Sequence, residues 1–362
     1  MRILVLEPWD RGSHRLMLDQ WTARSRHEFT RMGLAGRHWK WRMRHAPLTF
    51  ARQLQAPEFA AQTWDVIFTS DMLNLAEFRG LAPPSVRVLP AISYFHENQF
   101  TYPDRFRQER DLHFAYSNFV TAAAADQVWF NSAYHRDALL DAMESFLRRM
   151  PDHQEVDAPA LIRARSQVMH PGIDVQDTRA AQSADGPLRI AWVARWEHDK
   201  GPEIFFDACR ALRQRGTDIR LIMLGEHFSE VPDAFTRARS DLAAQVEHWG
   251  FAPDRRTYLQ LLASAHVVVS TAHHEFFGIA VLEAAAVGCR PVVPRALAYP
   301  ETLGDLAIFH DNTPRSVAAA IEAAARARED VSHPILTRFA WTARVDAFDD
   351  AIERAARGAT RP

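Results

Sequence analysis

Short apolar runs alternate with longer amphipathic segments along the first half of the chain. The runs have the length and composition of buried strands and lie at Ile3–Leu6, Asp65–Thr69, Val86–Tyr94, Gln127–Asn131 and Ser166–His170. The segments between them have helical periodicity and lie at Ser13–Ala23, Leu73–Arg79, Gln108–Ala125 and Ser132–Met150. Strands that alternate with helices in this way are typical of a parallel sheet covered on both faces.

A polar stretch from Gln176 to Gly186 has the composition of a linker, and a second series of the same kind follows it. Its predicted strands are Leu188–Ala194, Ile219–Leu224, Val246–Trp249, His266–Ser270 and Arg290–Val293. Its predicted helices are Glu203–Gln214, Ala234–Ala244, Arg255–Ser264 and Gly278–Val287, with a helical tail at Ser316–Arg328 and Leu336–Arg357.

These patterns predict an α/β fold of two Rossmann-like, doubly wound domains that face a cleft. The first domain covers residues 1–175 and the second covers residues 187–335, with a hinge near 175–187. For the C-terminal segment, 336–362, a return to the first domain is one of the arrangements that the sequence leaves open.

Composition narrows the class of protein. The 362 residues favour two cores over one, and a net charge of −2 gives no sign of a nucleic-acid coat or a membrane-surface protein. Two cysteines, Cys209 and Cys289, exclude a disulfide framework and favour a reducing compartment. No window reaches the ~18 apolar residues of a membrane span, so we expect no membrane partner and a cytoplasmic location.

The loop after the first strand contains Gly12 and Ser13 at the expected start of a helix. A glycine at a helix N-terminus lets backbone amides approach a phosphate, which makes this loop a candidate phosphate contact. The alternative is an ordinary turn in which the Ser13 hydroxyl caps the helix.

Two cations follow the first strand of the second domain. Arg195 and Lys200 lie in a strand-to-helix loop, and Gly201 and Pro202 after them favour a tight turn and a helix start. A planar guanidinium and a compact ammonium together suit a diphosphate. The alternative is a solvated charged loop. Lys200 is notable because only two of the 43 cationic residues are lysines.

Two glutamates flank the start of the next candidate helix. Glu275 precedes Phe277 and Gly278, and Glu283 lies among alanines and leucines further along. A carboxylate in apolar surroundings needs a partner, and ribose hydroxyls are suitable ones. The simpler interpretation of Glu275 is an acid favoured by the helix dipole. His273 and His274 lack a third nearby ligand, so we expect no metal.

Two stretches of the first domain carry candidate acceptor contacts. His96, Glu97, Asn98 and Gln99 end an apolar strand and form a polyol-binding pattern, although a capping or satisfied histidine is an alternative. A second stretch is basic and aromatic and suits phosphates and stacked bases, unless it is a solvated loop with its tryptophans packed inward. Its residues are Arg37, His38, Trp39, Lys40, Trp41, Arg42 and Arg44.

The second half resembles glycosyltransferase family 4, which has the GT-B fold. The resemblance rests on Pro171-Gly172-Ile173-Asp174, on Arg195 with Lys200-Gly201, on Trp249-Gly250, and on Glu275 with Glu283 around Phe277-Gly278. Over nearly the whole chain, LEPWDRGSHRLMLDQW, GRHWKWRMR, YFHENQFTYP and ARWEHDKGPEIFF are similar to the tRNA-queuosine α-mannosyltransferase family. One departure is Arg11, which stands where the best-known members carry the first glycine of GGSHK.

That resemblance implies an enzyme that transfers mannose from GDP-mannose to queuosine in the anticodon of an aspartate tRNA, with retention of configuration. The sequence contains no Asp-x-Asp, the usual metal–diphosphate motif of the other glycosyltransferase fold class, so we expect no metal requirement. It implies that Arg195 and Lys200 hold the diphosphate, that Glu283 holds the ribose, and that Glu275 with the amides after it contacts the sugar. It also implies that Gly12 lets its loop reach the diphosphate and that His96 lies beside the transferred sugar.

Other functions remain open at this point. A family 4 enzyme with a glycan, lipid or small-metabolite acceptor would have no need of the basic aromatic stretch. A non-catalytic nucleotide-sugar or RNA-binding protein would have less need of the full set Arg195, Lys200, Glu275 and Glu283. An epimerase on the same fold is disfavoured by the resemblance.

Overall fold

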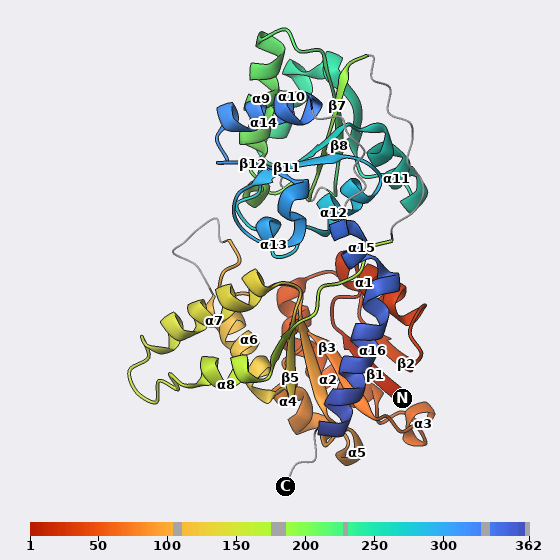
Figure 1. Ribbon diagram of the computed structural model, residues 1–362. Helices are drawn as coiled ribbons and strands as arrows, with labels where there is room; N and C mark the ends of the chain where they lie inside the picture. The colour runs from red at the N-terminus through yellow and green to blue at the C-terminus, as the bar shows by residue number, and fades with distance from the viewer. Residues whose placement is uncertain (104–110, 175–185, 227–230, 327–333, 359–362) are drawn as a thin grey trace. The chain divides into compact units, whose positions relative to one another are not determined.

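The computed structural model describes residues 1–103, 111–174, 186–226, 231–326 and 334–358. The chain forms two compact units, one of Met1–Gly172 with Trp341–Pro362 and the other of Ile173–Ala340 (Figure 1). Most of the expected linker and hinge, residues 175–185, lies outside the described part. In the described residues no helix has the length and apolar character needed to cross a membrane.

The first unit is built on a six-stranded sheet with the order β2-β1-β3-β4-β5-β6, in which every neighbouring pair is parallel. Its strands are β1 (Arg2–Glu7), β2 (Glu28–Gly33), β3 (Val66–Ser70), β4 (Ala91–Phe95), β5 (Gln127–Phe130) and β6 (Ser166–Val168). The strand order reverses at β1, because the chain places β2 on one side of it and β3 on the other.

Alternate residues of the central strands enter two different apolar clusters. Leu4 and Ile67 pack in one cluster, whereas Val5 and Phe68 pack in the other. Both faces of the sheet are therefore buried, which explains why the strands are continuous apolar runs. The covering helices are α1 (Gly12–Thr22), α2 (Trp39–Gln53), α3 (Pro57–Ala60), α4 (Leu75–Leu81), α5 (Pro84–Arg87), α6 (Leu112–Ala124), α7 (Ala133–Leu147), α8 (Ala158–Ala164) and α16 (Trp341–Gly358).

Helix α16 completes the first unit, although it follows the whole second unit in sequence (Figure 1). Phe348 is buried against Trp21 at 5.2 Å and Trp129 at 5.7 Å between ring centroids. Asp349, also buried, accepts hydrogen bonds from the Trp21 indole at 3.0 Å, the Ser25 hydroxyl at 2.7 Å and the backbone N–H of residue 26 at 2.9 Å. A polar anchor and an aromatic contact thus fix α16 on this face.

One predicted strand of the first unit needs correction, and two of its elements were not predicted. The strand predicted at Val86–Tyr94 starts at Ala91, because Pro84 starts the short helix α5 and Pro90 precedes the strand. Strand β2 was not predicted, because most of its side chains are only partly buried and its sequence lacks an apolar run. Helix α8, between α7 and β6, was likewise not predicted.

The second unit repeats the architecture with the order β12-β11-β10-β7-β8-β9, again with parallel pairs only. Its strands are β7 (Leu188–Val193), β8 (Ile219–Leu224), β9 (Val246–Gly250), β10 (Val267–Val269), β11 (Arg290–Pro294) and β12 (Ile308–His310). Its helices are η1 (His198–Lys200), α9 (Pro202–Gln214), α10 (Asp233–Asp241), η2 (Ala243–Gln245), α11 (Arg255–Ser264), α12 (Ile279–Ala286), α13 (Tyr299–Leu303), η3 (Gly304–Leu306), α14 (Pro314–Arg326) and α15 (Pro334–Phe339). The fold class of two Rossmann-like, doubly wound units is confirmed.

Candidate active site

The strand order of the second unit reverses at β7, which lies between β10 and β8. In doubly wound sheets the carboxyl ends of strands at such a point form the usual ligand site. The segment after β7 carries Arg195 and Lys200, and the segment after β10 carries Glu275. The fold therefore brings together residues that the sequence placed in separate motifs.

Lys200 lies in a nearly enclosed socket, with 11% of its side chain exposed. Its Nζ donates to the carbonyl oxygen of His274 at 2.7 Å, and it lies 3.0 Å from Asp199 Oδ2 and 3.8 Å from Glu275 Oε2. Gly201 follows in the left-handed region with φ 59°, and a Cβ there would lie 2.3 Å from the Thr271 carbonyl oxygen. The turn that positions the ammonium thus requires glycine.

Arg195 is more open than Lys200. Its side chain is 42% exposed, and its Nη2 lies 3.4 Å from Glu197 Oε2. The alternative of a solvated charged loop therefore describes Arg195 in part, but it does not describe the buried ammonium of Lys200.

Glu275 caps the start of α12. Its Oε1 accepts from the backbone N–H groups of Phe277 at 3.4 Å and Gly278 at 3.2 Å. Gly278 has φ 79°, and an added Cβ would lie 2.8 Å from the Tyr299 ring. The two amides that the resemblance assigns to a sugar are thus engaged by the Glu275 carboxylate in this structure.

Glu283 is buried in α12, with 4% of its surface exposed. Its Oε1 accepts from Arg255 Nη2 at 2.5 Å and its Oε2 accepts from the Tyr258 hydroxyl at 3.1 Å. Burial and the neighbouring carboxylate raise the pKa of Tyr258 well above its ordinary value, so this phenol remains a proton donor. The partner that Glu283 needs is supplied by α11, which the sequence did not indicate.

His274 contributes its carbonyl rather than its ring to this site. Burial and the charge of Lys200 lower the pKa of the imidazole to about 4, so the ring is neutral near pH 7. The neighbouring His273 uses its backbone N–H to donate to the Asp199 carbonyl at 2.7 Å. The pair therefore shapes the loop around Lys200.

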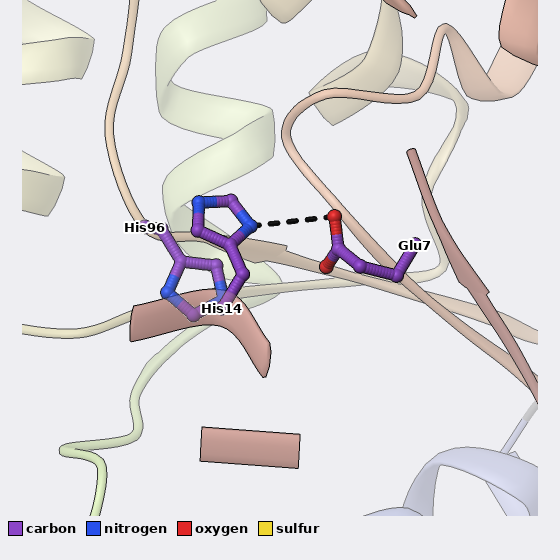
Figure 2. A group of neighbouring side chains, drawn as sticks. All are labelled: Glu7, His14 and His96. Carbon is purple, nitrogen blue, oxygen red and sulfur yellow. Dashed lines mark hydrogen bonds and ion pairs between the residues drawn. The ribbon is translucent and has the colours of Figure 1, made fainter. Parts of the chain in front are cut away.

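A second cluster lies in the first unit, at the corresponding reversal of strand order. Glu7 ends β1, His14 lies in α1 and His96 follows β4 (Figure 2). His14 Nδ1 lies 3.3 Å from Glu7 Oε1, and the His14 and His96 rings stack with centroids 3.8 Å apart and planes inclined by 24° (Figure 2). Glu7 Oε1 also accepts from the Trp9 N–H and the Ser70 hydroxyl, each at 2.8 Å.

This arrangement gives the two histidines different charges. Burial opposes protonation of His14, but the charge and hydrogen bond of Glu7 outweigh it and raise the pKa of His14 to about 9. Burial, together with the charges of His14 and His135, holds the pKa of His96 well below its ordinary value. A neutral imidazole therefore stacks on an imidazolium. Beside them, burial raises the pKa of Asp71 to about 7.

Glu7, His14 and His96 form the group of potential metal ligands among the described residues. A metal ion lies in the plane of each imidazole that binds it, about 2.1 Å from the nitrogen. Two nearly parallel rings stacked at 3.8 Å do not direct their lone pairs to one point. The geometry thus suits an ion pair beside a neutral histidine better than a metal centre.

The residues after His96 have different surroundings. Asn98 is fully buried, and its Oδ1 accepts from the N–H groups of Phe100 and Thr101 at 3.0 and 2.9 Å. Asn98 therefore holds the turn in this structure, and its contact with an acceptor stays a prediction. Glu97 and Gln99 are partly exposed.

The loop before α1 has the open N-terminus that the sequence indicated. Gly12 has φ 55°, and Ser13 lies inside the first turn without a capping hydrogen bond from its side chain, so the capping alternative is not observed. Arg11 has φ −155°, which is extended backbone that any residue adopts. The departure from glycine at Arg11 therefore introduces no backbone strain.

The basic aromatic stretch forms the start of α2 and is not a loop. Trp41 is 64% exposed and Trp39 is 37% exposed, so the alternative with both tryptophans packed inward is wrong. Lys40 Nζ lies 5.6 Å from the Trp39 ring centroid, and the Arg44 guanidinium lies 5.0 Å from the Phe114 ring centroid. Arg37 and His38 precede the helix on exposed backbone, and Arg42 donates to the Ala35 carbonyl at 2.8 Å.

Comparison with known proteins assigns both units. Residues 2–173 match a family described as tRNA-queuosine alpha-mannosyltransferase N-terminal, and residues 174–335 match glycosyl transferases group 1. The tRNA-queuosine alpha-mannosyltransferase of Drosophila melanogaster is 33% identical over 310 residues, which cover 83% of this chain and 81% of that protein. The chain belongs to the tRNA-queuosine alpha-mannosyltransferase family. It is therefore a glycosyltransferase, and the resemblance found in the sequence is confirmed.

Other known proteins are similar to this chain over a smaller part of its length or at lower sequence identity. The GDP-mannose-dependent alpha-(1-6)-phosphatidylinositol dimannoside mannosyltransferase of Mycobacterium tuberculosis (strain CDC 1551 / Oshkosh) is 34% identical over 40% of this chain and 37% of that protein. Among solved structures, HepE of Anabaena in complex with UDP aligns with a TM-score of 0.69 over 98% of this chain and 100% of that chain, at 16% identity. Sucrose-phosphate synthase of Thermosynechococcus elongatus aligns with a TM-score of 0.70 over 99% of each chain, also at 16% identity. These likenesses confirm the GT-B fold.

Sequence reasoning missed several members of the candidate site. Glu7 and His14 carried a recoverable signal, since an acid ends an otherwise apolar strand and a histidine follows on the next helix. Arg255 and Tyr258 carried none, because they meet Glu283 only through the packing of α11 on α12.

Proposed function

We propose that the protein transfers mannose from GDP-mannose to queuosine in a tRNA, with aspartate tRNA as the acceptor and with retention of configuration. The observation that carries the proposal is the match of residues 2–173, which form most of the first unit, to the N-terminal part of the tRNA-queuosine alpha-mannosyltransferase family. This part is specific to the family, whereas the second unit belongs to a broad group of glycosyl transferases.

The donor half of the proposal is supported by the charges around β7 and β10. Lys200 and Arg195 offer a buried ammonium and an open guanidinium to a diphosphate. The resemblance assigns the ribose hydroxyls to Glu283, whose carboxylate Arg255 and Tyr258 hold in place. GDP-mannose as donor is favoured by relatives whose names include it, such as the mannosyltransferase of Mycobacterium tuberculosis.

The chemistry requires stabilisation of the nucleoside diphosphate as it leaves the sugar. Lys200 and Arg195 supply positive charge that is in place before the bond breaks, which lowers the barrier without a metal ion. We favour a front-face transfer in which the leaving phosphate takes the acceptor's proton. In the first unit, Gly12 and Ser13 start a helix with free amides for the diphosphate, and the neutral His96 offers a hydrogen bond to the sugar.

The acceptor half is supported by the exposed face of α2 and the segment before it. Trp41 presents an aromatic surface for stacking on an unpaired base, and Arg37 and Lys40 are exposed beside it for phosphates. An anticodon loop offers both kinds of group. A neutral glycan could stack on Trp41 but offers no phosphate to Arg37 and Lys40.

The test is nucleoside mass spectrometry of queuosine-containing tRNA incubated with the protein and GDP-mannose. We expect a mass gain of one hexose on queuosine, in aspartate tRNA before other queuosine tRNAs, and no gain with UDP-glucose as donor. Absence of the gain with every queuosine tRNA would overturn the proposed acceptor, and the same gain from another sugar nucleotide would overturn the proposed donor.

A further inference from the structure

A pocket of about 410 Å³ opens in the first unit between the loop before α1 and the loop after β2. Its wall includes Arg11, Arg15 and Arg37, together with Asp10 and the short segment 33–36. Nothing in the donor chemistry described above uses this pocket. Its lining brings three guanidiniums to one hollow.

Two glycines allow the segment 33–36 to pack closely against the loop before α1 and so to form one wall of this pocket. A Cβ on Gly33 would lie 2.2 Å from Asp10 Oδ2, and a Cβ on Gly36 would lie 2.5 Å from Arg11 Cβ. Arg11 Nη1 donates to the Gly36 carbonyl at 3.4 Å, and the Asp10 N–H donates to the Leu34 carbonyl at 2.9 Å. The two walls are thus held together by close backbone approach, so the pocket is a built feature of the fold.

The pocket is electropositive. Asp10 is the acidic residue in its lining, and it is engaged by the guanidinium of Arg31. Arg15 has only a 3.5 Å contact with Asp19 and is 64% exposed on its side chain, and Arg37 is exposed at the rim. Guanidiniums in a concave site fit the tetrahedral oxygens of a phosphate.

The rim continues directly into the stacking surface of α2. Arg37 lines the pocket, His38 is the residue before α2, and Trp41, with 64% of its surface exposed, lies in the first turn of the helix. A single-stranded nucleic acid carries a phosphate next to each base, so it can occupy a phosphate pocket and an adjacent aromatic ring at once. A sugar nucleotide also joins a base to phosphates, but the cations proposed above for its diphosphate, Arg195 and Lys200, lie in the second unit.

We propose that the pocket of Arg11, Arg15 and Arg37 binds a backbone phosphate of the acceptor RNA, beside the base that stacks on Trp41. The proposal rests on the proposed function in its choice of RNA. Phosphate chemistry is shared with the donor diphosphate, so the experiment must separate these two sources.

The variants Arg15→Gln and Arg37→Gln remove charge from the pocket without touching the loop closure made by Arg11. The matched control is Arg357→Gln, an arginine on α16 that is 72% exposed and ion-paired with Glu353. For each protein we would measure direct binding of queuosine-containing tRNA over a range of salt, transfer kinetics for tRNA and for GDP-mannose, and thermal unfolding.

We expect each pocket variant to weaken tRNA binding by roughly 3- to 10-fold and to lower the slope of log affinity against log salt by about 1. The double variant should lower the slope by about twice as much, with the KM for GDP-mannose and the unfolding temperature unchanged. The control should match the wild type in every measurement.

Three outcomes would overturn the inference. If both variants keep the wild-type affinity and salt slope for tRNA while transfer proceeds, the pocket does not bind the acceptor and the proposed function stands. If the KM for GDP-mannose rises while tRNA binding is unchanged, the pocket belongs to the donor. If the wild-type protein neither binds tRNA nor modifies it, the proposed function fails as well.

Discussion

Lys200 is one of two lysines among 43 cationic residues, and its surroundings explain why an arginine would not serve at this position. Its ammonium reaches the His274 carbonyl, Asp199 and Glu275 within a socket that leaves 11% of the side chain exposed. A guanidinium is longer and planar, so it cannot meet three oxygens from one central atom. The spacing of Lys200 and Gly201 revealed the position of the cation, but two of the three oxygens around it, those of His274 and Glu275, come from a loop more than seventy residues away.

Lys200→Arg should lower kcat/KM for GDP-mannose by about 100-fold, the scale observed when one charge-stabilising donor is lost. The physical reason is the displacement of the positive charge from the socket. Arg195→Lys is the matched exchange at the open position and should cost about 10-fold, because 42% exposure leaves room to adjust. Steady-state kinetics with a thermal unfolding control would check both, and equal losses at the two positions would contradict the socket argument.

Glu283 is the other carboxylate whose environment depends on tertiary packing. Arg255→Gln should lower the free energy of unfolding by about 2 kcal/mol, less than the roughly 3–5 kcal/mol of a fully buried pair, because Arg255 is about one third exposed. Tyr258→Phe should cost about 1 kcal/mol through its lost hydrogen bond. Urea unfolding measures both, with the exposed neighbour Arg256→Gln as control; a loss at the control equal to that of Arg255→Gln would contradict the pairing.

At the scale of elements, the apolar runs were enough to predict most strands and helices of both sheets. The failures have local causes. Strand β2 lies at the sheet edge with half-buried residues, and the run ending at Tyr94 contains Pro90, which delays the strand. The helical nature of residues 39–53 was missed because cations and tryptophans obscure its buried positions, which include Met43 and Phe50. The hydrophobic periodicity of a segment reflects which of its positions are buried, so a partly exposed helix or strand shows only a weak periodic pattern.

Helix α16 depends on one buried carboxylate, and this dependence can be measured. Asp349→Ala leaves the donors of Trp21, Ser25 and residue 26 without their acceptor and should lower the free energy of unfolding by about 3 kcal/mol. Asp346→Ala on the same helix removes a carboxylate that is 82% exposed and should change stability by less than about 0.5 kcal/mol. Urea unfolding followed by tryptophan fluorescence distinguishes the two, and similar values would rule out the anchor role of Asp349.

At the scale of the whole molecule, the two units should respond differently to pH. In the second unit, burial lowers the pKa of His274 and of His310 to about 4. In the first unit the pKa of His14 is raised to about 9, while the lowered pKa of His96 and the raised pKa of Asp71 act in opposite directions below neutrality. The sequence alone predicted two units, but the pH dependence of each unit's stability depends on which histidines are buried in its core.

As the pH falls from 6.5 to 4.5, the unfolded second unit binds more protons than the folded one, so the stability of the second unit should decrease. As the pH rises from 6.5 to 9, the folded first unit retains the His14 proton that the unfolded chain loses, so the stability of the first unit should decrease. Hydrogen exchange corrected for its intrinsic pH dependence would report each unit from its own peptides. His14→Gln should remove the alkaline loss; persistence of that loss in the variant would assign it to other groups.

The placement of α16 also has a consequence for how the chain is made. A ribosome releases residues 1–172 first, then the whole of Ile173–Ala340, and only afterwards the helix that covers Trp21 and Trp129. Until then the aromatic surface of the nascent first unit is uncovered. The second unit, whose sequence lies between the two segments of the first, has by that time been synthesised in full. The second unit can therefore mature before the first, and a chaperone that binds exposed aromatic side chains has its longest opportunity on the segment that is synthesised first.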